Sequence, residues 1–323
     1  MRFISYEEGA APSAMSIAEM AKPEIKDHQV LIQVKAFGVN RADTLQRQGK
    51  YPSPEGESDI LGLEVAGVIE DIGNDVTQFS IGDPVFGLVP GGGYGEFVAV
   101  DASHVMRKPD SLGFTDAAGV AEVFLTAFQS LVWHLNVEQG DNILIHAGAS
   151  GVGLAAIQIA NVIGANIAVT ASSADKLSIC KENGAHILIN YEQEDFVEVV
   201  REQLGGVDHV LDFVGGEYLN KNLKVLNQDG HIVYLAMLAG RHTSLDMALL
   251  LGKRATITGS TLRNQSDEYK TELIEDFSLM VLPLLKNGKV RPNIDAIYPA
   301  TDIATTHQRL ESNDTMGKLI VTW

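Results

Sequence analysis

The stretch that decides the fold is GDNILIHAGASGVGLAAIQIA, residues 140–160. It contains a short apolar strand, Asn142 to His146, then a glycine-rich turn and the apolar helix Val152 to Ile163. Glycines at such a turn let the backbone bend tightly and approach a diphosphate, whose charge the helix N-terminus attracts. The expected cofactor contacts here are Gly148, Ser150, Gly151, Val152 and Gly153.

The turn departs from the strict GxGxxG pattern, because Ser150 stands at the second glycine position. A glycine-rich turn can also do no more than pack a helix against a sheet. Here, however, it lies at the first strand–helix junction of a longer alternation that starts at about residue 121. That setting favours a dinucleotide site over simple packing.

The segment that follows the turn continues to alternate strands and helices. IAVTAS, HILINY, VDHVLDFVG, HIVYLAM and ATITGST have the composition of strands. Between them lie two helical patterns, SADKLSICKENG, with Ser173 as its N-cap and Gly184 as its end, and DFVEVVREQL. The alternation predicts an α/β fold with a doubly wound parallel sheet.

The two ends of the chain have a different sequence pattern, without the alternation of strands and helices. Before about residue 120, short strand-like runs such as His28 to Phe37 and Glu64 to Gly73 are divided by Gly and Pro, and two strands flank a glycine turn between Val85 and Val100. This part predicts a mostly antiparallel β domain. After Leu262 we expect one helix, Tyr269 to Leu285, and then the strands DAIYP and KLIVTW, which resemble the first part. We therefore predict that residues 121–262 are inserted into a domain formed by residues 1–120 and 263–323.

The type of dinucleotide depends on the end of the second strand. NAD enzymes place Asp or Glu there, about 20 residues after the turn, to bind the ribose 2′-hydroxyl. This chain has Ser172 at that point and Lys176 one helical turn later. A hydroxyl and an ammonium can bind a 2′-phosphate that a carboxylate would repel, so the pattern predicts NADPH. Tyr191 could flank the adenine or phosphate, or be an ordinary strand aromatic.

Further cofactor contacts are expected at the carboxyl ends of the later strands, where doubly wound sheets present their ligands. These positions are Phe213, Leu235, Ser260 and Leu262.

Composition excludes several other functions. The formal net charge is −18 and no Lys/Arg cluster offsets it, which disfavours binding to RNA or DNA. No apolar run approaches the length of a membrane span, and Glu7 and Glu8 stand where a secretory signal would be apolar, so a cytoplasmic location is expected. Cys180 is the only cysteine, which excludes an internal disulfide and a multi-cysteine zinc site.

The sequence also resembles a known family along essentially its whole length. The segments NRADTLQRQGKYP, ILGLEVAGVI, PGGGYGEFV, FLTAF and GKLIV are similar, in order, to the quinone oxidoreductase (ζ-crystallin-like) branch of the medium-chain dehydrogenase/reductases. NRADTLQRQGKY, LIHAGASGVG and NYEQEDF most resemble its p53-inducible subgroup. The resemblance implies a GroES-like catalytic domain, a Rossmann domain and NADPH-dependent reduction of a quinone or related enone.

The resemblance also implies that no metal is bound. Zinc alcohol dehydrogenases of this superfamily hold their catalytic zinc through Cys, His and Cys. The corresponding positions here are Asn40, Leu63 and Glu122, and neither an amide nor a leucine side chain can replace a thiolate and an imidazole. A quinone is already electrophilic, so its reduction needs hydrogen-bond donors rather than a Lewis acid.

Asn40 and Tyr51 are the candidate catalytic donors, because an amide and a phenol can each donate to a developing oxyanion. The resemblance implies that they line the substrate site. Read without it, Asn40 is a turn residue and Tyr51 a loop aromatic beside Pro52. Asp43 is expected to be a structural acceptor. Thr126 matches the family threonine near the nicotinamide, or else is a helix threonine bonded to its own backbone.

Other functions remain open at this point. The same fold could reduce a 2-alkenal or an enoyl thioester, or the chain could bind NADPH without catalysis. We also expect a homodimer, because Arg254 to Thr261 has the character of an edge strand that could pair across a two-fold axis.

Overall fold

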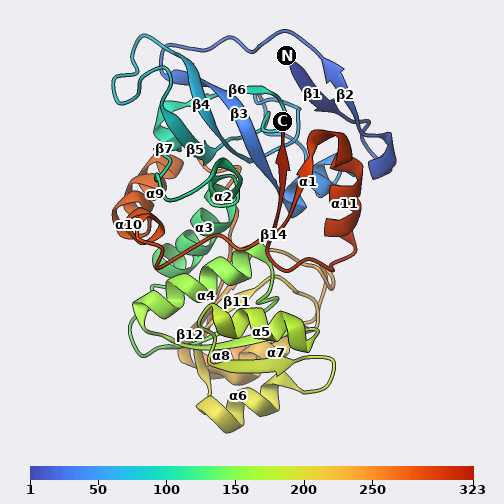
Figure 1. Cartoon of the computed structure of the whole chain (residues 1–323). Coiled ribbons are helices and arrows are strands. Elements are labelled where there is room, and N and C mark those ends of the chain that lie inside the picture. The colour runs from blue at the N-terminus through green and yellow to red at the C-terminus, as the bar shows by residue number, and fades with distance from the viewer. The chain divides into compact units, whose positions relative to one another are not determined.

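The computed structural model describes all 323 residues and contains two compact units. Unit 1 comprises Met1–Leu125 and Arg263–Trp323, and unit 2 comprises Thr126–Leu262. Figure 1 shows the course of the chain through both, with the two chain ends in unit 1.

Unit 2 is built on a six-stranded sheet in the order β10-β9-β8-β11-β12-β13, and every neighbouring pair of strands is parallel. This confirms the predicted doubly wound parallel sheet. The strands are β8 (Asn142–Ile145), β9 (Asn166–Ala171), β10 (Ile187–Asn190), β11 (Val207–Asp212), β12 (Leu226–Tyr234) and β13 (Thr256–Gly259).

The helices of unit 2 begin at side-chain caps that the sequence contains. Ser150, Ser173 and Asp195 each accept a hydrogen bond from a backbone N–H in the first turn of their helix. The cap at Ser173 was predicted and is confirmed. The helices are α4 (Gly151–Ile163), α5 (Ala174–Glu182), α6 (Phe196–Leu204), α7 (Tyr218–Val225) and α8 (Met247–Lys253). The helix α3 (Ala121–Phe128) continues as the π-helical segment η3 (Gln129–His134).

Unit 1 contains a seven-stranded sheet in the order β14-β15-β3-β4-β5-β7, with β6 paired to β3. All pairs are antiparallel except β14 with β15. The strand β15, at the end of the chain, pairs with β3. The strands are β3 (Gln29–Val39), β4 (Glu64–Ile72), β5 (Pro84–Leu88), β6 (Phe97–Asp101), β7 (Val105–Arg107), β14 (Ile294–Pro299) and β15 (Lys318–Thr322). A separate hairpin joins β1 (Arg2–Ser5) to β2 (Ser16–Glu19).

The helical segments of unit 1 connect these strands and pack on them. The helices are α1 (Arg41–Arg47), α2 (Phe114–Ala117), α9 (Asp267–Met280), α10 (Leu282–Lys286) and α11 (Ile303–Glu311), and the short 3₁₀ segments are η1 (Pro12–Ala14), η2 (Ala102–His104) and η4 (Ala300–Asp302). Phe37 and Tyr94 lie at the centre of the core, fully buried, with ring centroids 4.5 Å apart. No helix of the chain is both long enough and apolar enough to cross a membrane.

One sequence prediction about unit 1 is wrong in detail. The expected helix Tyr269 to Leu285 is two helices that break at Val281, because Pro283 has no N–H to continue the helical ladder. The two strands predicted around the glycine turn between Val85 and Val100 are present as β5 and β6, and they have different partners, since β5 pairs with β4 and β7 while β6 pairs with β3. The glycine turn between them packs on Gly62, and a Cβ at Gly93 would meet that residue's carbonyl carbon at 3.0 Å.

Candidate active site

Asp43 anchors the segment that holds the first candidate catalytic residue. Its carboxylate is fully buried and accepts hydrogen bonds from the backbone N–H of Asn40 (2.7 Å), the backbone N–H of Gly62 (3.1 Å) and the Tyr94 hydroxyl (3.1 Å). This confirms the predicted role of Asp43 as a structural acceptor. Burial raises the pKa of Asp43 to about 6, although the Asn40 N–H and the charge of Lys318 oppose the shift.

Asn40 belongs to a polar group that we call the Lys318 cluster, made of the buried Asn40, Glu64 and Lys318 and the partly buried Glu122. Asn40 is the N-cap residue of α1, and its Nδ2 donates to Glu64 Oε1 at 3.0 Å. Its Oδ1 accepts from Lys318 Nζ at 2.6 Å. Because one contact accepts from the amide nitrogen and the other donates to the amide oxygen, the orientation of the Asn40 amide is fixed. One of the two N–H groups of Asn40 Nδ2 donates to Glu64.

Lys318 neutralises this cluster. Its ammonium lies 2.6 Å from Glu64 Oε1 and 3.1 Å from the carbonyl oxygen of Val39, in addition to its bond to Asn40. Three acceptors therefore satisfy all three hydrogens of a buried ammonium. The close packing also explains Gly38, because a Cβ there would come within 2.2 Å of Glu64 Oε1.

Glu122 joins the cluster at the start of α3. Its backbone N–H donates to Glu64 Oε2 at 3.0 Å, so the second oxygen of Glu64 holds the beginning of this helix. Burial raises the pKa of the Glu122 carboxyl to about 8, and the charge of Glu64 adds to the shift. The carboxyl is therefore protonated at neutral pH.

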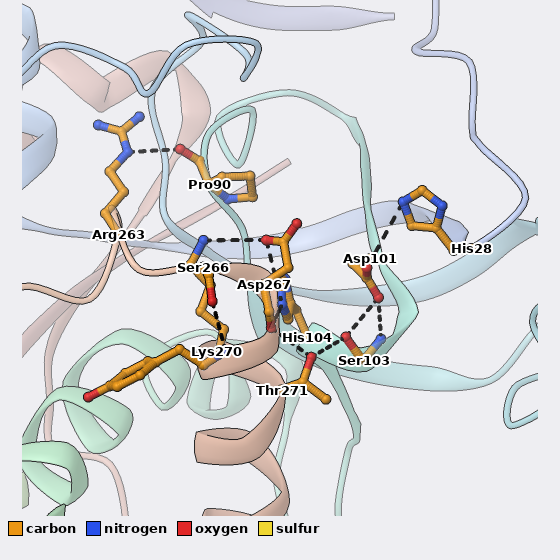
Figure 2. A network of polar contacts seen from close by, with 11 residues as sticks. His28, Pro90, Asp101, Ser103, His104, Arg263, Ser266, Asp267, Lys270 and Thr271 are labelled. Atoms are coloured by element: carbon orange, nitrogen blue, oxygen red, sulfur yellow. Dashed lines mark hydrogen bonds and ion pairs between the residues drawn. The ribbon is translucent and has the colours of Figure 1, made fainter.

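Tyr51 packs against a fixed arginine. The Arg263 guanidinium carbon lies 5.6 Å from the centre of the Tyr51 ring. Arg263 itself is buried and donates to the carbonyl oxygen of Pro90 (2.8 Å), Gln46 Oε1 (2.8 Å) and Ser53 Oγ (3.3 Å); Figure 2 shows the bond to Pro90. Burial raises the pKa of Tyr51, so its phenol keeps its proton at neutral pH and can donate it to a hydrogen bond.

The positions where zinc relatives hold their metal carry no comparable ligand set. Leu63 is part of the apolar core, and the side-chain amide of Asn40 is hydrogen-bonded to Glu64 and Lys318. No group of three His, Cys, Asp or Glu side chains in the structure could hold a metal ion.

In unit 2, the serine that replaces a glycine is a helix cap. Ser150 Oγ accepts from the backbone N–H of Gly153 at 3.1 Å at the start of α4. A Cβ at Gly153 would lie 2.6 Å from the carbonyl oxygens of Ala147 and Gly148, and one at Gly148 would lie 3.0 Å from Val169 Cβ. Gly148 and Gly153 are thus required by the packing of the turn itself. That packing also brings the start of α4, with Gly151 and Val152, to the carboxyl end of β8.

The two residues predicted to select the cofactor, Ser172 and Lys176, are in contact, and Tyr191 lies on the neighbouring strand end. Lys176 Nζ donates to Ser172 Oγ at 3.3 Å, just after β9. The backbone N–H of Tyr191, just after β10, donates to the carbonyl oxygen of Ala171 at 3.2 Å. Tyr191 is exposed, and no carboxylate replaces Ser172 at this point. Ser172, Lys176 and Tyr191 therefore lie at the neighbouring ends of β9 and β10.

The remaining predicted residues follow the next strands. Phe213, Leu235 and Ser260 come directly after β11, β12 and β13, and hydrogen bonds from the Leu235 and Ser260 N–H groups to the preceding strands keep these ends in line. Because the strands are parallel, these residues and Leu262 belong to the same sheet edge as the glycine turn. Thr126 is the exception, since it lies on α3, where its carbonyl oxygen accepts from Ser130 Oγ.

Buried polar residues behind this edge were not singled out from the sequence. Asp212 accepts from the backbone N–H of Gly215 (3.0 Å) and from Asn222 Nδ2 (2.6 Å), which holds the loop that carries Phe213. Asn222 also contacts His146 Nε2 at 2.8 Å. Burial lowers the pKa of His146, so this histidine is neutral and serves the loop rather than a ligand.

In unit 1, sequence reasoning missed Glu64, Lys318 and Arg263 as site residues and considered Glu122 only as a zinc position. A signal existed for two of them. Glu64 and Lys318 each stand directly before an apolar run at the start of a strand, and a charge at the start of a buried run needs a partner. Arg263 had no comparable signal.

Comparisons with known proteins agree with this arrangement. A family model described as "Zinc-binding dehydrogenase" matches residues 151–278, and one described as "Alcohol dehydrogenase GroES-like domain" matches residues 26–110. The quinone oxidoreductase of Homo sapiens is 30% identical over 328 residues, which cover 99% of this chain and 97% of the relative.

Solved structures are also similar over the whole chain. Escherichia coli quinone oxidoreductase complexed with NADPH has a TM-score of 0.90 and 27% identity, covering 100% of both chains. The CurK enoyl reductase has a TM-score of 0.89 and 27% identity, covering 99% of this chain and 98% of that one.

Proposed function

This chain belongs to the quinone oxidoreductase family of the medium-chain dehydrogenase/reductases, and from that premise we propose that it transfers a hydride from NADPH to a quinone. When bound, NADPH supplies the hydride from its nicotinamide ring. The chain's own residues bind the cofactor, orient the acceptor and supply hydrogen bonds to the oxygen on which charge develops.

The observation that carries the choice of cofactor is the Ser172–Lys176 pair at the end of β9. We assign this pair to the 2′-phosphate and the start of α4, with Gly148, Ser150, Gly151, Val152 and Gly153, to the diphosphate. Tyr191 lies next to Ser172 and is assigned to the adenine side. The other cofactor contacts in this proposal are Thr126, Phe213, Leu235, Ser260 and Leu262.

Asn40 and Tyr51 are the proposed donors to the substrate. Lys318 and Glu64 hold the Asn40 amide so that its second N–H can reach a ligand, and Arg263 holds the Tyr51 ring. A quinone carbonyl that receives a hydride becomes an oxyanion, which two such donors stabilise. This role requires no metal, in agreement with the side chains at Asn40, Leu63 and Glu122.

The test is an assay of cofactor oxidation with NADPH or NADH and four acceptors: an ortho-quinone, a para-quinone, a 2-alkenal and an enoyl-CoA. We expect the highest kcat/KM with NADPH and a quinone. Turnover of the enoyl-CoA alone would instead support the second candidate, an enoyl reductase, which the likeness to the CurK enoyl reductase favours. Binding of NADPH without turnover of any acceptor would indicate a non-catalytic protein.

We also propose that the protein is a homodimer formed through β13. This strand is at the edge of the sheet and pairs only with β12. Its Ile257 is 37% exposed and Leu251 of the preceding α8 is 72% exposed, so an apolar surface adjoins an unpaired strand edge. Light scattering at micromolar concentration should give twice the chain mass of 34.8 kDa. A monomeric mass would contradict this assembly.

A further inference from the structure

Reduction of a quinone needs a proton as well as a hydride. The hydride forms a new bond to the quinone and pushes an electron pair onto a carbonyl oxygen, so that quinone, NADPH and one proton give hydroquinone and NADP⁺. Asn40 and Tyr51 can stabilise the oxyanion, but a full proton must come from an acid that is neutral at working pH and is resupplied from solvent. The search for this proton donor rests on the proposed function, quinone reduction.

Glu122 has the surroundings of such an acid. Lys318, the cation of its cluster, is bonded to Glu64, Asn40 and Val39 rather than to the Glu122 carboxyl. Burial beside the charged Glu64 raises the pKa of Glu122 to about 8, which keeps the carboxyl protonated at neutral pH. Burial and, after it, the charge of the same carboxyl raise the pKa of Tyr51, which indicates that the two groups are close enough to interact.

A small cavity, the inner cavity, lies against Glu122. Its volume is about 10 Å³, which is enough for one water molecule. The polar part of its wall consists of Glu122, His104, Arg263 and Lys270, and the rest is apolar. A water at this point would have polar partners on several sides.

The inner cavity adjoins a larger one. This outer cavity has a volume of about 490 Å³ and shares Pro90, Arg263 and Lys270 with the inner one. Its wall includes Asp267 at the start of α9. The side chain of Lys270 is only 8% exposed and belongs to the wall that the two cavities share.

Asp267 connects the buried basic groups with solvent. Its side chain is 68% exposed, yet its Oδ1 lies 3.7 Å from Lys270 Nζ and 4.0 Å from His104 Nε2 (Figure 2). His104 Nε2 also contacts the carbonyl oxygen of Asp267 at 3.3 Å. Burial lowers the pKa of His104, so its ring is neutral and can accept a proton and pass it on.

We propose that Glu122 donates the proton to the reduced quinone and is reprotonated through the inner cavity, by way of His104, Lys270 and Asp267. The carboxyl O–H bond breaks as the new O–H bond of the hydroquinone forms, and the resulting carboxylate takes a proton that enters from solvent. The titratable and charged groups around Glu122 are Glu64, Lys318, Asp43, Arg263, Tyr51, His104 and Lys270.

The test compares wild-type protein with Glu122→Gln, which keeps the shape of the side chain but has no acidic proton. We expect kcat with a quinone to fall about 100-fold or more, while the Kd for NADPH changes less than twofold. Wild-type kcat should decrease above about pH 8, where Glu122 loses its proton, and the residual rate of the variant should lack this decrease. Glu122→Asp, which restores a carboxyl, should recover part of the rate.

Glu275→Gln is the matched control, because it makes the same change at an exposed position of α9 and should leave kcat unaltered. Lys270→Met tests the route and should lower kcat several-fold without changing the Kd for NADPH. An active wild type with an equally active Glu122→Gln variant of the same pH profile would overturn the donor role alone. A wild type inactive with every quinone would overturn the proposed function and the donor role with it.

Infrared spectroscopy of the free protein provides a readout that does not depend on activity. The difference between wild type and Glu122→Gln at pH 7 should contain the carbonyl band of a protonated carboxylic acid, and the band should disappear above about pH 8. Absence of this band at pH 7 would contradict the proposal even if Glu122→Gln reduced activity.

Discussion

At the scale of single residues, Lys318 makes the contacts that hold several residues of the site in place. Lys318 is the one cation bonded to Glu64. It also bonds to Asn40 at the beginning of α1, while Glu64 bonds to the backbone of Glu122 at the beginning of α3, so Lys318 links the two helix starts. A buried ion pair adds little net stability compared with an apolar core, but removal of one partner leaves an uncompensated charge. The cluster is therefore sensitive to the loss of this side chain.

The variant Lys318→Met should lower the free energy of unfolding by about 3–5 kcal/mol, because Glu64 would remain buried without a cation. It should also reduce kcat, since the Asn40 amide would lose the contact that fixes its orientation. Chemical denaturation and quinone kinetics measure the two effects. Lys289→Met, at an exposed position, is the control. A loss below about 1 kcal/mol would show that Glu64 finds another partner or a proton.

Two acids with raised pKa values, the buried Asp43 and the partly buried Glu122, also predict how stability depends on pH. The pKa values of Asp43 and Glu122 are raised to about 6 and about 8, from 3.8 and 4.5. A folded state that holds these protons more tightly than the unfolded chain is favoured at low pH, and this contribution is lost as pH rises through the folded pKa values. Glu122→Gln lacks the second group, so its Tm should rise relative to wild type between about pH 5 and pH 8. A constant difference in Tm across this range would contradict the assignment.

At the scale of elements, the turn before α4 serves two purposes with the same atoms. Its glycines pack against β9 and against the carbonyl groups of the turn, and Ser150 caps the helix whose N-terminus is assigned to the diphosphate. Packing and binding were alternative interpretations of this turn from sequence. In the structure, the packing of the turn requires glycine at Gly148 and Gly153. The same turn places the N-terminus of α4 at the sheet edge where the other predicted cofactor residues lie.

Gly153→Ala should therefore weaken both stability and NADPH binding. The added methyl group would lie 2.6 Å from two carbonyl oxygens, so the turn must shift, at a cost of about 1–3 kcal/mol. Calorimetry should detect a higher Kd for NADPH. Gly252→Ala in α8 is a matched control, because nothing lies within 4 Å of its added Cβ and alanine favours a helix. Equal behaviour of the two variants would contradict the account of the turn.

Local signals explain what the sequence predicted at this scale. The strands of unit 2 and the cap at Ser173 follow from short-range hydrophobic patterns and hydrogen bonds within a few residues. The pairing of β6 with β3, instead of β5, depends on contacts between residues more than 60 positions apart, such as Gln33 and Phe97. Helices α7 and α8 were not identified, and α8 has no buried residue from which a pattern could arise.

At the scale of the whole molecule, the family resemblance and the parallel sheet could be predicted, while the Lys318 cluster could not. Asn40 and Lys318 are 278 residues apart, and only the pairing of β15 with β3 brings them together. Spacing within the sequence carries no information about such a contact. Asn40 and Tyr51 lie outside the helices and strands of unit 1, as their readings as a turn residue and a loop aromatic expected, and their catalytic role stays a prediction. The residues that hold them became visible only in the fold.

We propose that this protein uses NADPH, held by Ser172 and Lys176, to reduce quinones. The most direct measurement is the initial rate of quinone reduction with NADPH and with NADH, for wild type and for Ser172→Asp. We predict a kcat/KM at least about tenfold higher with NADPH for wild type, and loss of this preference in the variant, because one unfavourable charge pair near a phosphate is worth 1.4 kcal/mol or more. Equal rates with both cofactors in wild type, or no quinone reduction with either, would contradict the account.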